Sequence, residues 1–321
     1  MNKCIKTIFR KQNLLVAIFN IKLLTVAATS LTSKRSIITT SVLDNTNKMT
    51  LKRVVPTISE YSDFNKYLGD FLNKDDKLTL MLDYDGTLAA IAPNPNMTAM
   101  SKEVENSLKK FAVHPNIFLG VISGRGLEDV KNKVGIPNIT YGGNHGLEIE
   151  NPDGSRSDFQ LDGELKEKYQ KMVQELNEKV RRNGAWNEDK LVSLTFHYRD
   201  VPEEMMDDIK TEAIKIIKSY GFKPNQAHYA IEAKPPVNWH KGEALKFILN
   251  KNFGDGWQHK TKVIFAGDDT TDEDAMEAVQ GKGKSFRITD NPNFETYADY
   301  RLPNQNMMPE LIKWIENIYY K

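Results

Sequence analysis

Two aspartates separated by a single residue, Asp83 and Asp85, follow a short apolar run and precede a glycine, Gly86. Residues 78–82 (Leu-Thr-Leu-Met-Leu) have the continuous apolar character of a parallel strand that is buried on both faces. Ligands and chemistry in such sheets collect at the carboxyl ends of the strands. A carboxylate pair at that place suits phosphoryl transfer or metal binding, although an Asp-Gly pair alone is also compatible with a simple hairpin turn.

Three further predicted strands also end in polar side chains. They are residues 116–122, followed by Ser123 and Arg125; residues 139–141, followed by Asn144 and His145; and residues 262–266, followed by Asp268 and Asp269. A helix pattern that begins at Ser101 separates the first two strands along the chain. This β-α-β-α-β order predicts parallel pairing with right-handed crossovers, so we expect these strand ends on one rim of a sheet.

The pattern changes between residues 148 and 235. The segments there are a hairpin-like stretch at 148–154, a charged helix near 165–182, an alternating strand at 191–198, a helix near 203–220 and a strand near 228–233. We interpret this insert as a separate α/β cap domain that is entered and left through hinges. The expected boundaries are 51–147 and 236–321 for an α/β core domain with a Rossmann-like parallel sheet, and 148–235 for the cap.

The composition is that of a soluble globular protein. The chain has 321 residues, of which 40% are hydrophobic and 27% charged, and this length is sufficient for two domains. Its net charge of +1 is unevenly distributed, because residues 1–43 carry seven basic residues and no acid. Residues 44–321 hold the other 37 Lys and Arg against all 43 Asp and Glu, a net charge of −6. A mildly acidic body gives no electrostatic reason to expect a nucleic acid or an anionic membrane as partner.

The first 50 residues have the character of a leader, and we exclude them from the fold. Residues 14–19 resemble the apolar region of a secretory signal, whereas the acid-free, Ser-rich and Thr-rich continuation fits a mitochondrial transit peptide equally well. If the leader is absent or bypassed, a cytoplasmic body is expected. The apolar run is too interrupted for a stable membrane span. The single cysteine, Cys4, lies in this leader, so the body has neither a thiolate metal site nor a cysteine nucleophile.

The ordered set of motifs resembles the haloacid dehalogenase-like (HAD) phosphohydrolases, and more closely their trehalose-6-phosphate phosphatase family. The resemblance covers nearly all of residues 75–315 and is far more specific than any one motif. Its motifs are Leu82-Asp-Tyr-Asp-Gly-Thr-Leu88, Ser123-Gly-Arg125, Gly143-Asn-His-Gly-Leu-Glu148, Glu232-Ala-Lys-Pro235, Lys241-Gly242 and Gly267-Asp-Asp-Thr-Thr-Asp-Glu273. It implies a HAD core with an inserted cap.

The resemblance also implies four catalytic roles. Asp83 would be the nucleophile that forms an aspartyl-phosphate, and Asp85 would protonate the leaving sugar oxygen and later activate water. Ser123 would donate a hydrogen bond to the transferring phosphoryl group. Lys241 would neutralise the charge of that group and orient Asp83.

A magnesium ion is the cofactor that the resemblance implies. Asp83, the backbone carbonyl of Asp85, and Asp268 would supply oxygen ligands of the kind that Mg²⁺ prefers. Asp269 and Asp272 would be auxiliary or outer metal groups. Asp272 also has a purely structural interpretation, since an acidic residue in the first turn of the following helix is favourable to the helix dipole.

Sugar recognition is expected from residues at the third strand end and in the cap. The resemblance assigns Asn144, His145, Glu232 and Lys234 to the sugar hydroxyls, and Arg125 is a weaker candidate for phosphate or sugar contact. A satisfied loop histidine and a surface Glu-Lys pair remain the structural alternatives. Trp239 could stack on a sugar ring or seal the hinge, and sealing is the favoured interpretation. Asn238 and His240 have no assigned role.

The leading hypothesis is therefore a magnesium-dependent phosphatase that converts trehalose 6-phosphate to trehalose and phosphate. The alternatives are a phosphatase of another sugar phosphate, such as sucrose phosphate, and a non-catalytic module that senses phospho-aspartate or a sugar phosphate. Only 82 residues precede Asp83, so we expect a stand-alone phosphatase rather than a fusion to a synthase. The expected partner is a small sugar phosphate, and the oligomeric state is left open.

Overall fold

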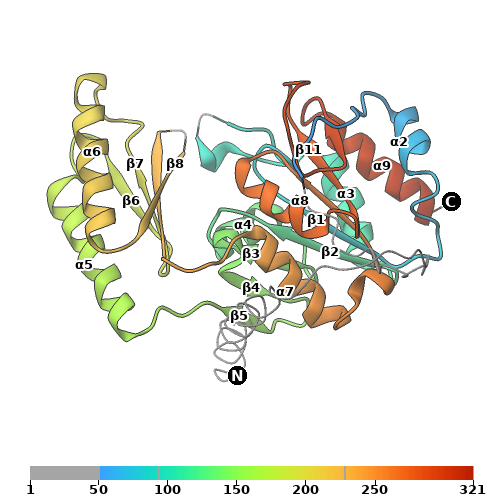
Figure 1. Ribbon diagram of the computed structural model, residues 1–321, viewed down its shortest axis with the longest axis horizontal. Helices are drawn as coiled ribbons and strands as arrows, with labels where there is room; N and C mark the ends of the chain where they lie inside the picture. Colours follow the sequence, from blue (N-terminus) through green and yellow to red (C-terminus); the bar gives the residue numbers. More distant parts are fainter. Residues whose placement is uncertain (1–50, 93, 228, 321) are drawn as a thin grey trace, which may run out of the picture. The chain divides into compact units, whose positions relative to one another are not determined.

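The computed structural model describes residues 51–92, 94–227 and 229–320, and these residues form two β-sheets with their covering helices (Figure 1). The larger sheet has eight strands in the order β12-β11-β10-β1-β2-β3-β4-β5, and the smaller has four in the order β6-β7-β9-β8. The leader predicted at residues 1–50 lies outside the described residues. Among those that are described, no helix has both the length and the apolar character needed to cross a membrane.

Six neighbouring strands of the large sheet run parallel to one another. They are β12 (Tyr300–Leu302), β11 (Lys284–Ile288), β10 (Lys262–Gly267), β1 (Leu78–Leu82), β2 (Ile117–Ile122) and β3 (Thr140–Gly143). The four strands predicted from apolar runs are all present, with ends that differ from the expected ones by no more than two residues. The α/β fold class with a parallel sheet is thus confirmed.

The large sheet is covered by helices on both faces, which explains its almost wholly apolar strands. One face packs against α2 (Tyr61–Leu68), α3 (Lys102–Phe111), α4 (Leu127–Val134) and α9 (Met307–Tyr319), and the other against α7 (Lys241–Phe253) and α8 (Glu273–Val279). Alternate residues of β1 serve the two cores, because Leu80 and Leu82 belong to the first and Met81 to the second. Burying both faces in this way fixes the strand that carries Asp83.

The hairpin near residue 148 belongs to the large sheet, which corrects the expected start of the cap at that residue. Strand β4 (Glu148–Glu150) pairs antiparallel with β3, and β5 (Arg156–Asp158) pairs antiparallel with β4. The alternating polar pattern of these short strands fits a sheet edge as well as a separate domain. The pattern alone therefore could not assign them to one or the other.

The cap consists of the small sheet and two long helices. Its elements are α5 (Gly163–Lys179), β6 (Trp186–Asp189), β7 (Leu194–His197), α6 (Glu203–Ser219), β8 (Lys223–Ala227) and β9 (Ala230–Lys234). Both helices cover one face, where Phe196 and Ile231 pack in a core of their own. Because side chains alternate along a strand, residues such as Glu188 and Glu232 lie on the other face of the small sheet, which the two helices do not cover.

Gly143, at the end of β3, allows the sheet to approach the start of α4. A Cβ atom at this position would lie 2.4 Å from the backbone nitrogen of Leu127 and 2.5 Å from its Cα. We expect Gly143→Ala to lower the free energy of unfolding by about 1–3 kcal/mol, since the clash is with backbone. Gly163→Ala is the matched control, because nothing lies within 4 Å of its Cβ position. Urea unfolding of the full chain measures both, and equal stability of Gly143→Ala and wild type would contradict the close approach.

Candidate active site

Neighbouring strand ends bring together residues that are far apart in the sequence. In the large sheet β1 lies between β10 and β2, so Asp83, Ser123 and Asp268 follow directly on three adjacent strands. The backbone nitrogen of Asp83 donates a hydrogen bond to the carbonyl oxygen of Ala266 at 3.0 Å, which ties the residue to the end of β10. The expected gathering of strand ends on one rim is therefore present.

Three carboxylates form an acidic cluster at this rim. One oxygen each of Asp83, Asp268 and Asp272 lies within 4.8 Å of the other two. Asp83 and Asp272 are buried, and Asp268 is partly exposed. Carboxylate oxygens are the ligands that hard divalent cations such as Mg²⁺ prefer. The cluster thus has the donor chemistry of a metal site.

Lys241, the first residue of α7, joins two of these carboxylates. Its Nζ lies 2.7 Å from Oδ1 of Asp83 and 2.7 Å from Oδ1 of Asp272, and only 2% of its side chain is exposed. Burial by itself would lower the pKa of Lys241, but Asp272 and Asp83 outweigh it and hold that pKa above its usual value. The ammonium group therefore remains charged and fixes the position of one oxygen of Asp83.

The remaining charge of the cluster is negative and poorly compensated. Burial raises the pKa of Asp83 well above its usual range; Lys241 opposes this shift, while Asp272 and Asp268 add to it. Burial, together with Asp272, also raises the pKa of Asp268 to about 7. Crowded carboxylates at low dielectric disfavour their ionised forms, and a bound cation removes this penalty. Both the donor set and its charge fit a divalent cation.

A glycine is required where the chain turns over this cluster. Gly86 has φ +78°, and a Cβ atom there would lie 2.0 Å from Oδ2 of Asp268. The next residue, Thr87, has its hydroxyl 3.4 Å from the other carboxylate oxygen of Asp268 and donates to it. The Asp-Gly turn therefore lets the backbone at Gly86 lie close to the carboxylate of Asp268, and it is not the turn of a hairpin.

Asp85 does not share the cluster of Asp83 but faces Arg125. The guanidinium donates to both carboxylate oxygens of Asp85, at 2.6 and 2.7 Å, and also to Asp129 at 2.7 Å. Burial by itself would lower the pKa of Arg125, but the carboxylates of Asp85 and Asp129 outweigh this effect and hold that pKa above its usual value. Arg125 was a candidate for substrate contact, and the structure places it as the group that holds Asp85. Asp272, which was predicted to be an auxiliary group, lies beside Asp83 in the acidic cluster.

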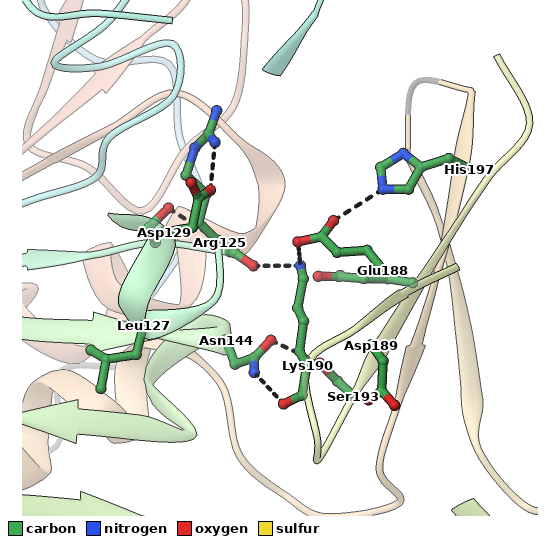
Figure 2. A network of polar contacts seen from close by, with 12 residues as sticks. Arg125, Leu127, Asp129, Asn144, Glu188, Asp189, Lys190, Ser193 and His197 are labelled. Carbon is green, nitrogen blue, oxygen red and sulfur yellow. Dashed lines mark hydrogen bonds and ion pairs between the residues drawn. The ribbon is translucent and has the colours of Figure 1, made fainter. Parts of the chain in front are cut away.

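Asn144 connects the core to the turn between β6 and β7, as Figure 2 shows. Its Oδ1 accepts from the hydroxyl of Ser193 at 2.8 Å, and its Nδ2 donates to the carbonyl oxygen of Lys190 at 3.3 Å and to Glu148 at 2.9 Å. Only 1% of Asn144 is exposed. The resemblance assigned this side chain to the sugar. In the structure its Oδ1 and one amide hydrogen bond the cap, and the other amide hydrogen bonds Glu148 of the large sheet.

Lys190 is a residue of this interface that the sequence analysis did not single out. Its Nζ donates to the carbonyl oxygen of Gly124 at 3.0 Å and lies 3.7 Å from Glu188, with 8% of the side chain exposed (Figure 2). In the sequence it follows Asp189 in a polar turn, where a lysine normally faces solvent. No local signal distinguishes it from a surface lysine.

His145 and the two predicted cap residues also meet across the domain boundary. Nε2 of His145 lies 2.8 Å from Oε1 of Glu232, whose other oxygen lies 3.0 Å from Nζ of Lys234. Burial alone would raise the pKa of Glu232, but His145 and Lys234 hold it below its usual value. This places a carboxylate, an imidazole and an ammonium group of the predicted sugar site side by side.

Ser123 and Asp269 have distinct local environments. The Ser123 hydroxyl is 1% exposed and accepts from the backbone nitrogen of Arg125 at 3.2 Å, so its own hydrogen is available to another acceptor. Oδ1 of Asp269 accepts from the backbone nitrogen of Thr270 at 2.7 Å and caps the short helix η4 (Thr270–Asp272). Asp269 thus stabilises the loop that presents Asp272.

Comparison with known proteins identifies relatives over most of the chain. The trehalose-phosphatase family model matches residues 81–306. Trehalose-phosphate phosphatase B of Arabidopsis thaliana is 30% identical over 256 residues, covering 75% of this chain and 68% of that protein. Trehalose 6-phosphate phosphatase RA3 of Zea mays is 28% identical over 260 residues, covering 76% and 71% respectively.

Solved structures share the fold at lower sequence identity. The C-terminal domain of C. albicans trehalose-6-phosphate phosphatase superposes with a TM-score of 0.66 at 19% identity, covering 83% of this chain and 99% of that one. A haloacid dehalogenase-like hydrolase from Bacteroides thetaiotaomicron superposes with a TM-score of 0.52 at 17% identity, covering 74% and 98%. The fold is that of the HAD hydrolases, and the chain belongs to the trehalose-phosphatase family.

Proposed function

We propose that this protein is a magnesium-dependent phosphatase that hydrolyses trehalose 6-phosphate to trehalose and phosphate through an aspartyl-phosphate at Asp83. Membership of the trehalose-phosphatase family supports the substrate, and the relatives named above are phosphoric monoester hydrolases. The observation that carries the mechanism is the contact of Lys241 Nζ with only one oxygen of Asp83. That contact leaves Oδ2 of Asp83 as the attacking atom.

In the first displacement, Oδ2 of Asp83 forms a bond to phosphorus while the bond from phosphorus to the sugar oxygen breaks. The sugar oxygen takes a proton from the carboxylic acid form of Asp85, which becomes a carboxylate. Asp85 is paired with Arg125 in the described conformation, so it must exchange this contact for the sugar oxygen during the step. Asp83 thus attacks phosphorus while Asp85 transfers the proton, and the two carboxylates can take separate roles because their partners differ.

In the second displacement, water attacks phosphorus and the bond to Asp83 breaks, which releases phosphate and restores the carboxylate. Asp85, which became a carboxylate in the first displacement, accepts the proton of that water. Lys241, which contacts Asp83, and the hydroxyl of Ser123, whose hydrogen is available, would bind the phosphoryl oxygens in both steps. The two displacements together therefore return every group to its initial protonation state.

The carboxylates of Asp83, Asp268 and Asp272 would hold the magnesium ion, and the backbone carbonyl of Asp85 stays a proposed further ligand. When bound, the ion would neutralise the crowded carboxylates and the phosphate, so that an anionic nucleophile can approach an anionic substrate. The raised pKa values of Asp83 and Asp268 support this assignment, because a cation is the simplest means of keeping both groups ionised. Asp272 is accordingly proposed as a ligand, beyond the auxiliary role expected from the sequence.

The first test is phosphate release from trehalose 6-phosphate by the purified full chain, with Mg²⁺ and with a chelator. We expect activity with Mg²⁺ and none with chelator. Asp83→Asn should reduce kcat at least about a thousandfold, because a neutral amide is a poor nucleophile toward phosphorus. Asp255→Asn, at an exposed position outside the cluster, is the matched control. Appreciable turnover by Asp83→Asn, or full activity with chelator, would contradict the mechanism.

The second test separates Asp272 from its neighbour Asp269. Asp272→Asn removes the charge of a buried member of the cluster, so the Mg²⁺ concentration for half-maximal activity should rise about 10–100-fold. Asp269→Asn should leave this concentration unchanged, since its amide oxygen can still cap η4. Titration of kcat/KM with Mg²⁺ measures both variants. An unchanged requirement in Asp272→Asn would exclude Asp272 as a ligand.

A further inference from the structure

A further strand of the large sheet, β11, brings a buried cation to the rim of the active site. Arg287 of this strand pairs in register with Gly267, the residue that precedes Asp268 at the end of β10. None of the sequence motifs includes Arg287, and the mechanism above makes no use of it. Its side chain is buried. Burying a guanidinium group is costly unless other groups compensate for the lost water, so its contacts show what it does there.

The guanidinium group of Arg287 holds the loop that carries part of the acidic cluster. Its Nη1 donates a hydrogen bond to the backbone carbonyl oxygen of Asp269. The same carbonyl oxygen accepts from the backbone nitrogen of Asp272 at 3.1 Å, and Oδ2 of Asp272 accepts from the backbone nitrogen of Asp269 at 3.0 Å. Arg287 is therefore bonded to the closed turn that connects two members of the cluster, Asp268 and Asp272.

Two further contacts fix the orientation of the guanidinium group itself. Its Cζ lies 4.6 Å from the centroid of the Phe294 ring, and its Nη1 lies 3.6 Å from Oε1 of Glu273. Glu273 is held in turn, because its two carboxylate oxygens accept from the hydroxyl of Thr296 and from the backbone nitrogen of Tyr297, both at 2.8 Å. A planar group that is stacked on one side and paired on another has little freedom to turn.

The turn that Arg287 holds presents the groups on which the cluster depends. Oδ1 of Asp272 lies 2.7 Å from Nζ of Lys241, and Asp268 directly precedes Asp269 in the chain. A movement of the backbone at Asp269 would therefore displace two carboxylates at once. Groups that orient metal ligands without touching the metal change metal affinity by about 10–100-fold when they are removed.

The positive charge of Arg287 has an effect of the opposite sign. Burial, together with Asp272, raises the pKa of Asp268 to about 7, and Arg287 is one of the cations that oppose this rise, so its charge is felt in the cluster. A positive charge there also repels an incoming Mg²⁺ ion. Removing the charge alone would strengthen Mg²⁺ binding, whereas releasing the turn would weaken it. The direction of the change in affinity therefore distinguishes the two roles.

We propose that Arg287 is a positioning residue for the magnesium site, which fixes the turn that presents Asp268 and Asp272 by its hydrogen bond to the carbonyl oxygen of Asp269. The inference rests on the proposed function, since it concerns the cation assigned to that cluster. The hydrogen bond outweighs the charge, because Glu273 offsets part of the charge while the bond to the carbonyl oxygen is direct. This role requires no contact of Arg287 with the substrate or the metal.

Binding of Mg²⁺ to the full chain, measured by titration calorimetry without substrate, tests the proposal. Arg287→Leu removes both the charge and the donors, and Arg287→Lys keeps the charge but loses the planar, forked group. We expect the Kd for Mg²⁺ to rise about tenfold in Arg287→Leu and by a smaller factor in Arg287→Lys. A role through charge alone predicts a lower Kd in Arg287→Leu and an unchanged Kd in Arg287→Lys.

Arg301→Leu is the matched control. Arg301 is also buried, pairs in register with Arg287 on the neighbouring strand β12, and donates to a backbone carbonyl oxygen, that of Thr289, at 2.7 Å. Its Nε donates to the hydroxyl of Thr57 at 3.0 Å, so these bonds hold segments outside the acidic cluster. We expect thermal unfolding to show that both leucine variants are destabilised, and calorimetry to show a wild-type Kd for Mg²⁺ in Arg301→Leu.

An unchanged or lower Kd in Arg287→Leu would overturn the proposal, and so would an equal rise in Arg301→Leu. If Arg287→Leu does not fold, Arg287→Lys decides, and a wild-type Kd in that variant overturns the proposal. A wild type that binds no Mg²⁺ would overturn it together with the metal assignment. A wild type that binds Mg²⁺ but does not hydrolyse trehalose 6-phosphate would count against the proposed function, while the expected changes in Kd would still support the role of Arg287.

Discussion

The contact of the Lys241 ammonium group with Asp83 and Asp272 is the interaction on which the rest of the site depends. All three side chains are buried, so none of these charges could be kept there without the others. The pair of contacts fixes the start of α7 against the end of β1 and the loop after β10. It also leaves Asp268 beside two other carboxylates with one cation to share among them. A site of this kind is arranged for one more cation and for an anionic substrate, because the protein itself supplies too little positive charge.

The parallel sheet makes this arrangement possible from residues more than 150 positions apart. Strand β1 is buried on both faces and lies between β2 and β10, so its carboxyl end has little freedom to move relative to theirs. Asp83 directly follows this strand and is therefore held in place with it. Gly86 lets the chain turn away without displacing Asp268. Groups that must meet phosphorus within a few tenths of an ångström are thus placed by backbone pairing, while the cap adds groups through side-chain contacts across the domain boundary.

The sequence could predict the elements that follow a regular pattern and could not predict which side chains would pair. Apolar runs located β1, β2, β3 and β10, and Ser101 located the start of α3 through its side-chain cap. The hairpin at β4 and β5 was assigned to the cap because short polar strands look alike at a sheet edge and in an insert. The partners of Arg125, Asn144 and Asp272 depend on the relative placement of distant segments, which no local spacing records. Lys190 was not singled out for the same reason, because it is buried only where the cap docks on the core.

Unused hydrogen-bonding capacity distinguishes the polar residues that hold this site together from those available to a substrate. Asn144 uses both amide hydrogens and its oxygen within the protein, and Arg125 is shared among Asp85, Asp129 and nearby oxygens. Such groups gain nothing from a sugar unless the protein first gives up bonds of equal value. Ser123, His145 and Trp239 each keep one buried donor or acceptor for which the described residues provide no partner. A ligand that bonds these three atoms adds hydrogen bonds without breaking any, so recognition is expected to concentrate there while the saturated residues determine how the cap rests on the core.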